Sequence, residues 1–174
     1  MTDPAPIDRD DLAVVAEQLG RTPRGTRAVA HRCPCGRPDV VETTPRLADG
    51  SPFPTLYYLT CPRAVAACSR LESDGLMKEM NAALAADPDL AARYRAAHED
   101  YLARRAKIGD VPEIAGVSAG GMPTRVKCLH VHLAHALAAG PGVNPFGDQA
   151  RERTEPWWTD GPCVPAASPD AGSS

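Results

Sequence analysis

The hydrophobic pattern of the chain alternates between helical spacing and short apolar runs. Near the N-terminus, Leu12, Val15 and Leu19 fall on one helical face. Asp8 is placed to cap this helix at its start, and Gly20 is placed to end it in the left-handed conformation. The pattern therefore predicts an amphipathic helix between these two residues.

Later stretches predict three strands and four more helices. A short apolar run predicts a strand over residues 27–32, and runs rich in β-branched and aromatic residues predict strands over 40–44 and 55–60. Helices are expected from Pro62 to just before Gly75, over about 76–85, from Pro88 to about Lys107 and from about Pro123 to Ala139. The Asp49-Gly50 turn signal lies among several prolines, which favours a wide loop or an edge position over a tight hairpin. We expect an α+β fold, a small antiparallel sheet packed with several helices.

Length and composition set the expected domain limits. The 174 residues suit one domain with a real core. Residues 1–7 and 151–174 are poor in residues that can be buried and rich in Pro, Ser and charged groups, which is typical of disorder. We therefore expect a disordered N-terminus over 1–7, a single domain over 8–150 and a disordered tail over 151–174.

Charge and hydropathy exclude some classes of protein. The formal net charge of −3 argues against a general nucleic-acid binder, which normally carries a basic surplus. No apolar run reaches membrane-spanning length, and "MTDPAPIDRDD" has acidic residues where a signal peptide would be basic and then apolar. We expect a cytoplasmic protein whose six cysteines are thiols, ligands or buried side chains rather than a disulfide framework.

The segment "RVKCLHVHLAHALAAG" concentrates one cysteine and three histidines. On a helix, at about 100° per residue, Cys128, His132 and His135 share one stripe and His130 points nearly the opposite way. An irregular first turn is the alternative, and it would let Cys128 and His130 converge. Either arrangement brings a thiol and an imidazole together, as a metal site or a nucleophile with its base requires.

Other cysteines supply candidate metal ligands. Cys33 and Cys35 lie in a proline-bounded loop, and Cys61 lies at the end of a predicted strand. Several thiolates with an imidazole favour zinc, and an iron–sulfur cluster held by three cysteines and one histidine is the alternative. The ligand types do not separate these two cofactors.

A glycine-rich loop, "GVSAGGMPTRVK", precedes the histidine segment. Backbone amides before a helix and nearby cations are typical of a phosphate or carboxylate site. The candidate residues for such an anion are Ser118, Gly120, Gly121, Arg125 and Lys127. The alternative is a flexible connection made of good turn residues.

Several strings are similar to an uncharacterised bacterial family, domain of unknown function 501. They include "CPCGRPDVVETTPRLADGSPFPTLYYLTCP", "AHEDYLARR" and "GVSAGGMPTRVKCLH", and the resemblance covers about residues 25–150. It implies a cytosolic bacterial protein, typically encoded near enolase, a septum-formation protein and an exopolyphosphatase. The family pattern matches Cys33, Cys61, Cys128, His130 and His135. With this resemblance, the expected metal ligands are Cys33, Cys61, Cys128 and His135, with Cys35 and His132 as alternates.

Three functions follow as hypotheses. The first is a metal-binding domain with an anion-binding loop. The second is an enzyme with Cys128 as nucleophile and His130 or His135 as base. The third is an interaction protein linked to cell division with its cysteines simply buried, and only the implied gene neighbourhood motivates it.

Overall fold

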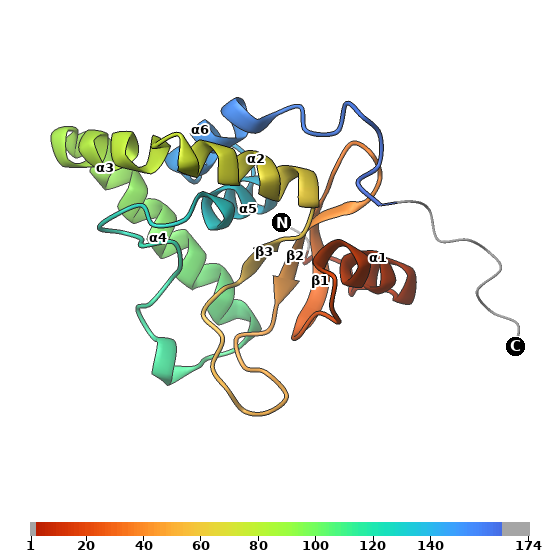
Figure 1. Ribbon diagram of the computed structural model, residues 1–174. Helices are drawn as coiled ribbons and strands as arrows, with labels where there is room; N and C mark the ends of the chain where they lie inside the picture. The colour runs from red at the N-terminus through yellow and green to blue at the C-terminus, as the bar shows by residue number, and fades with distance from the viewer. Residues whose placement is uncertain (1–2, 165–174) are drawn as a thin grey trace, which may run out of the picture.

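The computed structural model describes residues 3–164, which form a three-stranded antiparallel sheet surrounded by helices (Figure 1). The strands are β1 (Thr26–Arg32), β2 (Pro38–Thr43) and β3 (Tyr57–Leu59). The helices are α1 (Arg9–Leu19), α2 (Pro62–Ser73), α3 (Leu76–Ala86), α4 (Pro88–Ile108), the 3₁₀ helix η1 (Pro112–Ile114), α5 (Leu129–Ala139) and α6 (Pro145–Thr154). The expected α+β class is confirmed.

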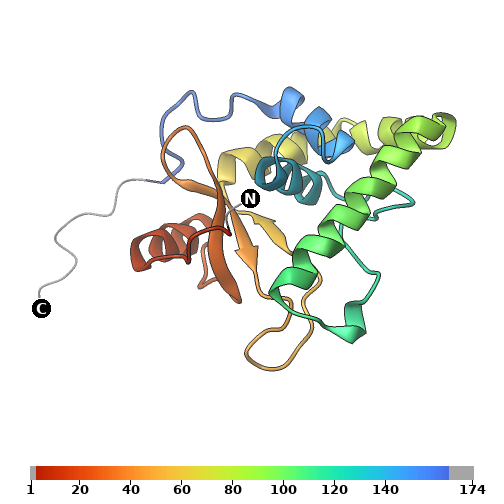
Figure 2. The same cartoon turned by 180° about the vertical axis from the view of Figure 1, so that it is seen from behind.

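The sheet lies between helices, with the strands in the order β1-β2-β3. Every residue of β2 is buried, because α1 covers one face of the sheet and α5 lies against the other (Figures 1 and 2). At the outer edge of β1, Pro6 bridges to Ala28 and the Ile7 amide donates to the Arg27 carbonyl. The two edges of the sheet therefore differ, since the chain itself covers part of the β1 edge.

Local capping signals place most elements where the sequence predicts them. Asp8 Oδ1 accepts a hydrogen bond from the Asp11 amide at 2.8 Å, and Gly20 adopts φ 68° at the end of α1. Pro62 and Pro88 open α2 and α4. The three strands also lie within or close to the expected ranges. Local sequence thus determines these boundaries.

The helix with three histidines begins later than expected. It starts at Leu129 rather than near Pro123, because the preceding segment bonds to other parts of the chain. The Asn81 side chain accepts from the Val126 amide at 2.9 Å and donates to the Val126 carbonyl at 3.0 Å. The backbone of Cys128 is extended, with φ −154° and ψ 118°, so this residue caps the helix instead of joining it.

The region after residue 140 is more ordered than its composition suggests. Helix α6 crosses the boundary expected at residue 150, and it starts at Pro145 after the Asn144 cap. Trp157 and Val164 are buried beyond it. The expectation of a disordered tail is therefore wrong for residues 151–164, and residues 165–174 lie outside the described residues. The expected disorder over 1–7 does not hold for residues 6 and 7, which bond to β1, and residues 1–2 also lie outside the description.

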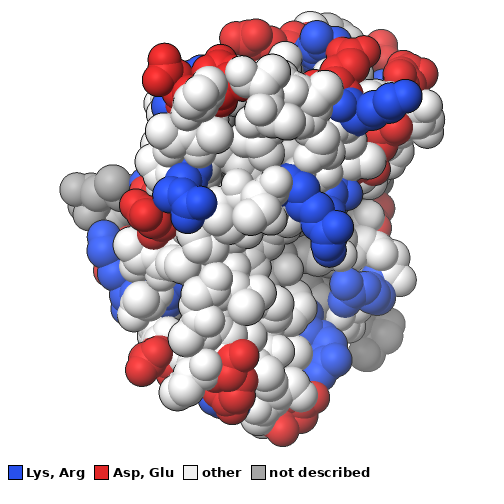
Figure 3. Space-filling model, turned by 90° about the vertical axis from the view of Figure 1, so that its left-hand side faces the viewer, with Lys and Arg blue, Asp and Glu red and all other residues white. Residues whose placement is uncertain are grey.

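Charges of both signs are spread over the surface. On the face shown in Figure 3, Lys and Arg side chains lie on both sides of a largely uncharged middle, and acidic side chains gather mainly toward the two ends. This face therefore carries no continuous basic surface. Within residues 3–164, no helix combines the length and the apolar character that crossing a membrane requires.

Candidate metal centre

Three potential ligand atoms converge where α2 ends and α5 begins. Cys128 Sγ lies 3.6 Å from His130 Nδ1, and His130 Nδ1 lies 3.1 Å from Glu72 Oε1. All three atoms lie within 4.8 Å of one another. Each side chain is partly buried, so the cluster is sheltered but reachable from solvent.

The helix start explains how the cysteine and the histidine meet. Because Cys128 is an extended cap, its side chain does not follow the helical phase that would separate it from His130. Glu72 belongs to the last turn of α2, and its Oε1 also accepts from the Leu129 amide at 2.8 Å. The carboxylate therefore satisfies one of the unpaired amides at the start of α5 while facing the imidazole. Cys128 and His130 therefore converge, as the alternative considered from the sequence allows, but because the helix begins after Cys128 rather than through an irregular first turn.

The far nitrogen of His130 is held by α2. Nε2 lies 3.2 Å from the Val65 carbonyl and 3.3 Å from Ser69 Oγ. A carbonyl only accepts hydrogen bonds, so Nε2 carries a proton. The proton on Nε2 leaves Nδ1 facing the thiol and the carboxylate, and a hydrogen bond from the far N–H to a backbone carbonyl is typical of metal-ligating histidines.

The electrostatics favour an ionised thiol. Burial alone would raise the pKa of Cys128, but a hydrogen bond with His130 and one from the Val131 amide outweigh it and lower the pKa. The bond with Cys128 is the main cause that raises the pKa of His130, and Glu72 adds to it. A thiolate is also the form in which cysteine binds metals or attacks an electrophile.

A family model described as a protein of unknown function (DUF501) matches residues 29–152, well over half of the chain. The chain belongs to the DUF501 family. The matched region includes all three residues of the Glu72, Cys128 and His130 cluster. No curated protein and no solved structure shows significant similarity to the chain.

Within this DUF501 region, the structure does not gather the four ligands expected from the sequence. Among the described residues, Glu72, Cys128 and His130 form the one group of three or more potential ligand atoms within 4.8 Å of one another. Cys33 and Cys61 are buried, and burial raises the pKa of each thiol to about 12. Cys33 lies beside Cys35, whereas Cys61 lies beside Cys163 from the C-terminal segment.

His132 and His135 belong to a buried hydrogen-bond network instead. Both side chains are fully buried, and the Asn144 amide nitrogen lies 3.1 Å from His132 Nδ1 and 3.2 Å from His135 Nδ1. His135 Nε2 donates to Asp100 Oδ2 at 2.9 Å. Burial would raise the pKa of Asp100, but the bonds from His135 and Arg104 lower it. Both nitrogens of His135 are therefore engaged.

His132 is similarly occupied. Its Nε2 lies 3.1 Å from both the Gly120 carbonyl and the Tyr94 hydroxyl. Burial lowers the pKa of His132 to about 4, so the ring is neutral at neutral pH. A neutral ring that accepts at Nδ1 and donates at Nε2 leaves no lone pair for a metal.

The glycine-rich loop uses many of its amides internally. The Met122 amide donates to the Ala119 carbonyl, both the Thr124 and Arg125 amides donate to the Gly121 carbonyl, and the Lys127 amide donates to the Gly120 carbonyl. Ser118 is buried and its hydroxyl lies 2.8 Å from His98 Nδ1. The Arg125 and Lys127 side chains remain exposed, so an anion site here stays a prediction that rests on them.

Glu72 is the functional candidate that the sequence does not reveal. It lies in "CSRLESDG", where a carboxylate near a helix end is usually a solvated charge. One signal was available: Val65, Ser69 and Glu72 recur at helical spacing, and all three contact His130. That signal becomes specific only when α2 packs against α5.

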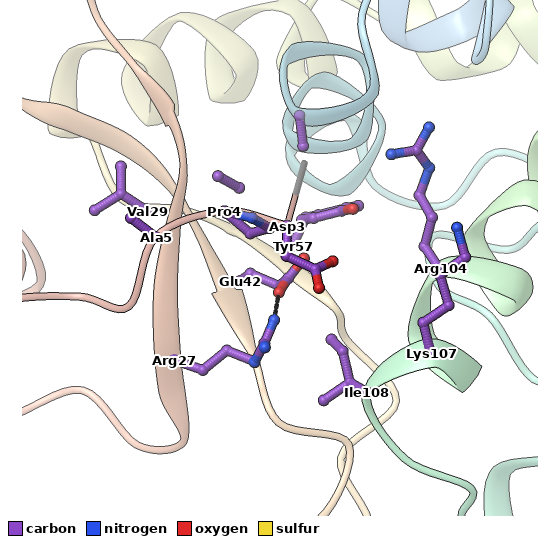
Figure 4. A pocket seen from close by; sticks show the side chains of 12 residues that line it. Asp3, Pro4, Ala5, Arg27, Val29, Glu42, Tyr57, Arg104, Lys107 and Ile108 are labelled. Atoms are coloured by element: carbon purple, nitrogen blue, oxygen red, sulfur yellow. Dashed lines mark hydrogen bonds and ion pairs between the residues drawn. The ribbon is translucent and has the colours of Figure 1, made fainter. Parts of the chain in front are cut away.

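Several hollows lie along the sheet, and two of them bear on the candidate site. One, of about 570 Å³, opens beside Cys128 and His130. The other, of about 450 Å³, lies between the sheet and α4 (Figure 4). In the second hollow Arg27 pairs with Glu42, and Arg104 bonds to Asp100 at 2.7 Å, so these arginines are matched by acids of the same chain. Because Cys128 and His130 line the first hollow, that hollow is the one associated with the candidate metal centre.

Proposed function

We propose that the protein is a zinc-binding protein whose ion is held by Glu72, Cys128 and His130. The observation that carries the proposal is the convergence of three different ligand types, a carboxylate oxygen, a thiol sulfur and an imidazole nitrogen, on one point. Zinc accepts all three types. A site with a single thiolate favours zinc over an iron–sulfur cluster, which is normally held by several cysteines.

The distances support tetrahedral coordination. Ligand atoms about 2.0–2.3 Å from a zinc ion at tetrahedral angles lie about 3.3–3.6 Å from each other. The corresponding separations are 3.6 Å between Cys128 Sγ and His130 Nδ1 and 3.1 Å between His130 Nδ1 and Glu72 Oε1. The ligand atoms of Cys128 and Glu72 lie within 4.8 Å of each other, so holding the ion would require these two side chains to approach by up to about 1 Å.

Three protein ligands leave one coordination position for water or a ligand. Structural zinc sites are normally closed by four protein ligands, whereas catalytic sites keep one position open. Cys128 and His130 also line the hollow of about 570 Å³. The proposed ion would therefore act on a molecule bound in that hollow rather than only stabilise the fold.

Elemental analysis tests the proposal directly. Protein purified without a histidine tag and without chelators is expected to contain about one zinc per chain, since the site provides one set of ligands. Isothermal titration of the metal-free protein should show the same stoichiometry. The proposal would be contradicted if the purified protein contained less than about a tenth of a zinc ion per chain and the titration also gave a stoichiometry below about a tenth.

A cysteine nucleophile is the second candidate function. Cys128 lies at the N-terminus of α5 beside an imidazole and faces the same hollow, as an activated thiol requires. Its geometry is less suited to this role, because Glu72 and Cys128 both face Nδ1 of His130 instead of opposite ring nitrogens.

Alkylation kinetics test this candidate. In metal-free protein at pH 7, Cys128 should react with iodoacetamide about tenfold faster than a free cysteine, because a lowered pKa increases the thiolate fraction. The site is identified by mass spectrometry of the modified peptide, with Cys68 as a buried internal control. A Cys128 rate no higher than that of free cysteine would count against the nucleophile.

A further inference from the structure

The hollow beside Cys128 and His130 follows the outer edge of β3. We call it the edge groove, and it is lined by Gln18, Leu19, Thr55, Tyr57, Tyr58, Leu59, Thr60, Pro62, Val65, Ala66, Cys128, His130 and Val131. Successive side chains of a strand point to opposite faces of a sheet. Tyr57, Tyr58, Leu59 and Thr60 all line the groove, so it runs along the strand edge rather than over one face. Because β3 is the last strand in the order, this edge has no neighbouring strand.

The backbone of β3 presents unpaired groups to this groove. The Thr60 amide donates to the Asp39 carbonyl, and the Thr43 amide donates to the Leu56 carbonyl. Residues alternate in an antiparallel ladder, so Leu59 directs its N–H and C=O away from β2. Leu59 is 5% exposed, and neither of these groups has a hydrogen-bond partner among the described residues.

Two side-chain oxygens in the same wall also lack partners within residues 3–164. They are Thr60 Oγ1 and Gln18 Oε1, and both atoms are buried. Gln18 Nε2 donates to the Pro38 carbonyl at 2.7 Å, which fixes Oε1 as the acceptor. Buried polar groups are normally hydrogen-bonded, so the unpaired N–H and C=O of Leu59 indicate a ligand that supplies one acceptor and one donor, with the two buried oxygens of Thr60 and Gln18 on residues of the same wall.

The walls select the shape of that ligand. Leu19, Pro62, Val65, Ala66 and Val131 provide apolar contacts on both sides of the strand edge. An extended peptide fits this groove, because its backbone offers an N–H and a C=O at the spacing of a strand and its side chains can contact the apolar walls. The chain covers part of its β1 edge with residues 6 and 7, whereas the β3 edge meets this groove.

We propose that the edge groove binds an extended peptide, which pairs with Leu59 as an added strand and passes beside Cys128 and His130. The Leu56 and Tyr57 amides already donate to the Tyr101 hydroxyl, so Leu59 supplies the pairing bonds, and the rest of a bound segment of about five residues contacts the groove side chains. This inference goes beyond the proposed zinc site, since strand pairing does not require a bound ion.

The test uses a capped hexapeptide of alternating Thr and Val and two N-methylated versions of it. An extended peptide directs successive N–H groups to opposite sides, so methylating one alternate set removes the pairing donors and methylating the other set does not. Binding to the full chain is followed by nuclear magnetic resonance, up to about 5 mM peptide because short peptides bind weakly. The Leu59 amide signal should shift, and one methylated peptide should bind at least about tenfold more weakly than the other.

A protein variant locates the site. Ala66→Phe fills the groove from an exposed position on α2, and Ala82→Phe places the same ring on an exposed position of α3 outside the groove. Ala66→Phe should weaken peptide binding about tenfold, and Ala82→Phe should not. Equal binding of both methylated peptides would show apolar association without strand pairing and would overturn the proposal. So would the absence of any Leu59 shift, or an Ala66→Phe protein that is folded by circular dichroism and binds normally. The zinc content of each sample is measured separately, so that a failure of peptide binding can be told apart from a failure of the protein to bind zinc.

Discussion

Cys128→Ser protein is expected to retain less than about a tenth of the zinc bound by the unaltered protein, because a serine hydroxyl is a far weaker zinc ligand than a thiolate. His130→Ala should have a similar effect, since it removes the nitrogen that faces both other ligands. Glu72→Gln should weaken binding less, because an amide oxygen still occupies the position without its charge. Elemental analysis and competition with a chromophoric chelator would measure both content and affinity.

Matched cysteine variants separate this site from the ligand set expected from the sequence. Cys33→Ala and Cys61→Ala remove buried thiols that lie outside the group around Cys128. Both variants are expected to keep about one zinc per chain, provided circular dichroism shows that they are folded. Loss of zinc from Cys33→Ala and Cys61→Ala as well as from Cys128→Ser would instead support the set expected from the sequence, Cys33, Cys61, Cys128 and His135.

The comparison between these two ligand sets shows what periodicity can predict. Helical spacing groups Cys128 with His132 and His135 only if the helix already includes residue 128. In the structure, α5 begins one residue later, and the extended cap turns the thiol toward His130. One boundary therefore changes which imidazole faces the cysteine, and helix boundaries are the least reliable part of a sequence prediction.

Local and distant interactions differ in how far sequence reveals them. The cap of α1 and the proline starts of α2 and α4 depend on residues close in the chain, and these elements lie as predicted. The contact between Glu72 and His130 joins residues far apart in sequence, and it needs two helices to pack. The same holds for α6, whose Asn144-Pro145 start is a visible signal but whose order also depends on packing against α5.

The histidines that do not bind the proposed ion stabilise the contact between α5 and α6. Asn144 is completely buried, and its Oδ1 accepts from the Gly147 amide at 3.0 Å as the cap of α6. Its amide nitrogen lies within 3.2 Å of Nδ1 in both His132 and His135. Since the amide nitrogen has only hydrogens to offer, both histidines accept at Nδ1 and carry their proton on Nε2. One side chain thus caps a helix and fixes two tautomers.

Asn144→Ala is therefore expected to lower the free energy of unfolding by about 3–7 kcal/mol. The lost cap accounts for about 1 kcal/mol, and each buried imidazole acceptor left without a donor costs about 1–3 kcal/mol. Urea denaturation followed by circular dichroism would measure the change. Asn144→Ser should recover about 1 kcal/mol, because its hydroxyl can still cap the helix.

Asp87→Ala is the matched control, since Asp87 caps α4 at an exposed position and contacts no histidine in the described structure. It should cost only about 1 kcal/mol, the usual value for a helix cap. The difference in the free energy of unfolding between the two alanine variants then gives the contribution of the hydrogen bonds from Asn144 to the two buried histidines. If Asn144→Ala were no more destabilising than Asp87→Ala, the imidazoles would not depend on this amide, and their assignment as structural rather than metal-binding residues would lose its main support.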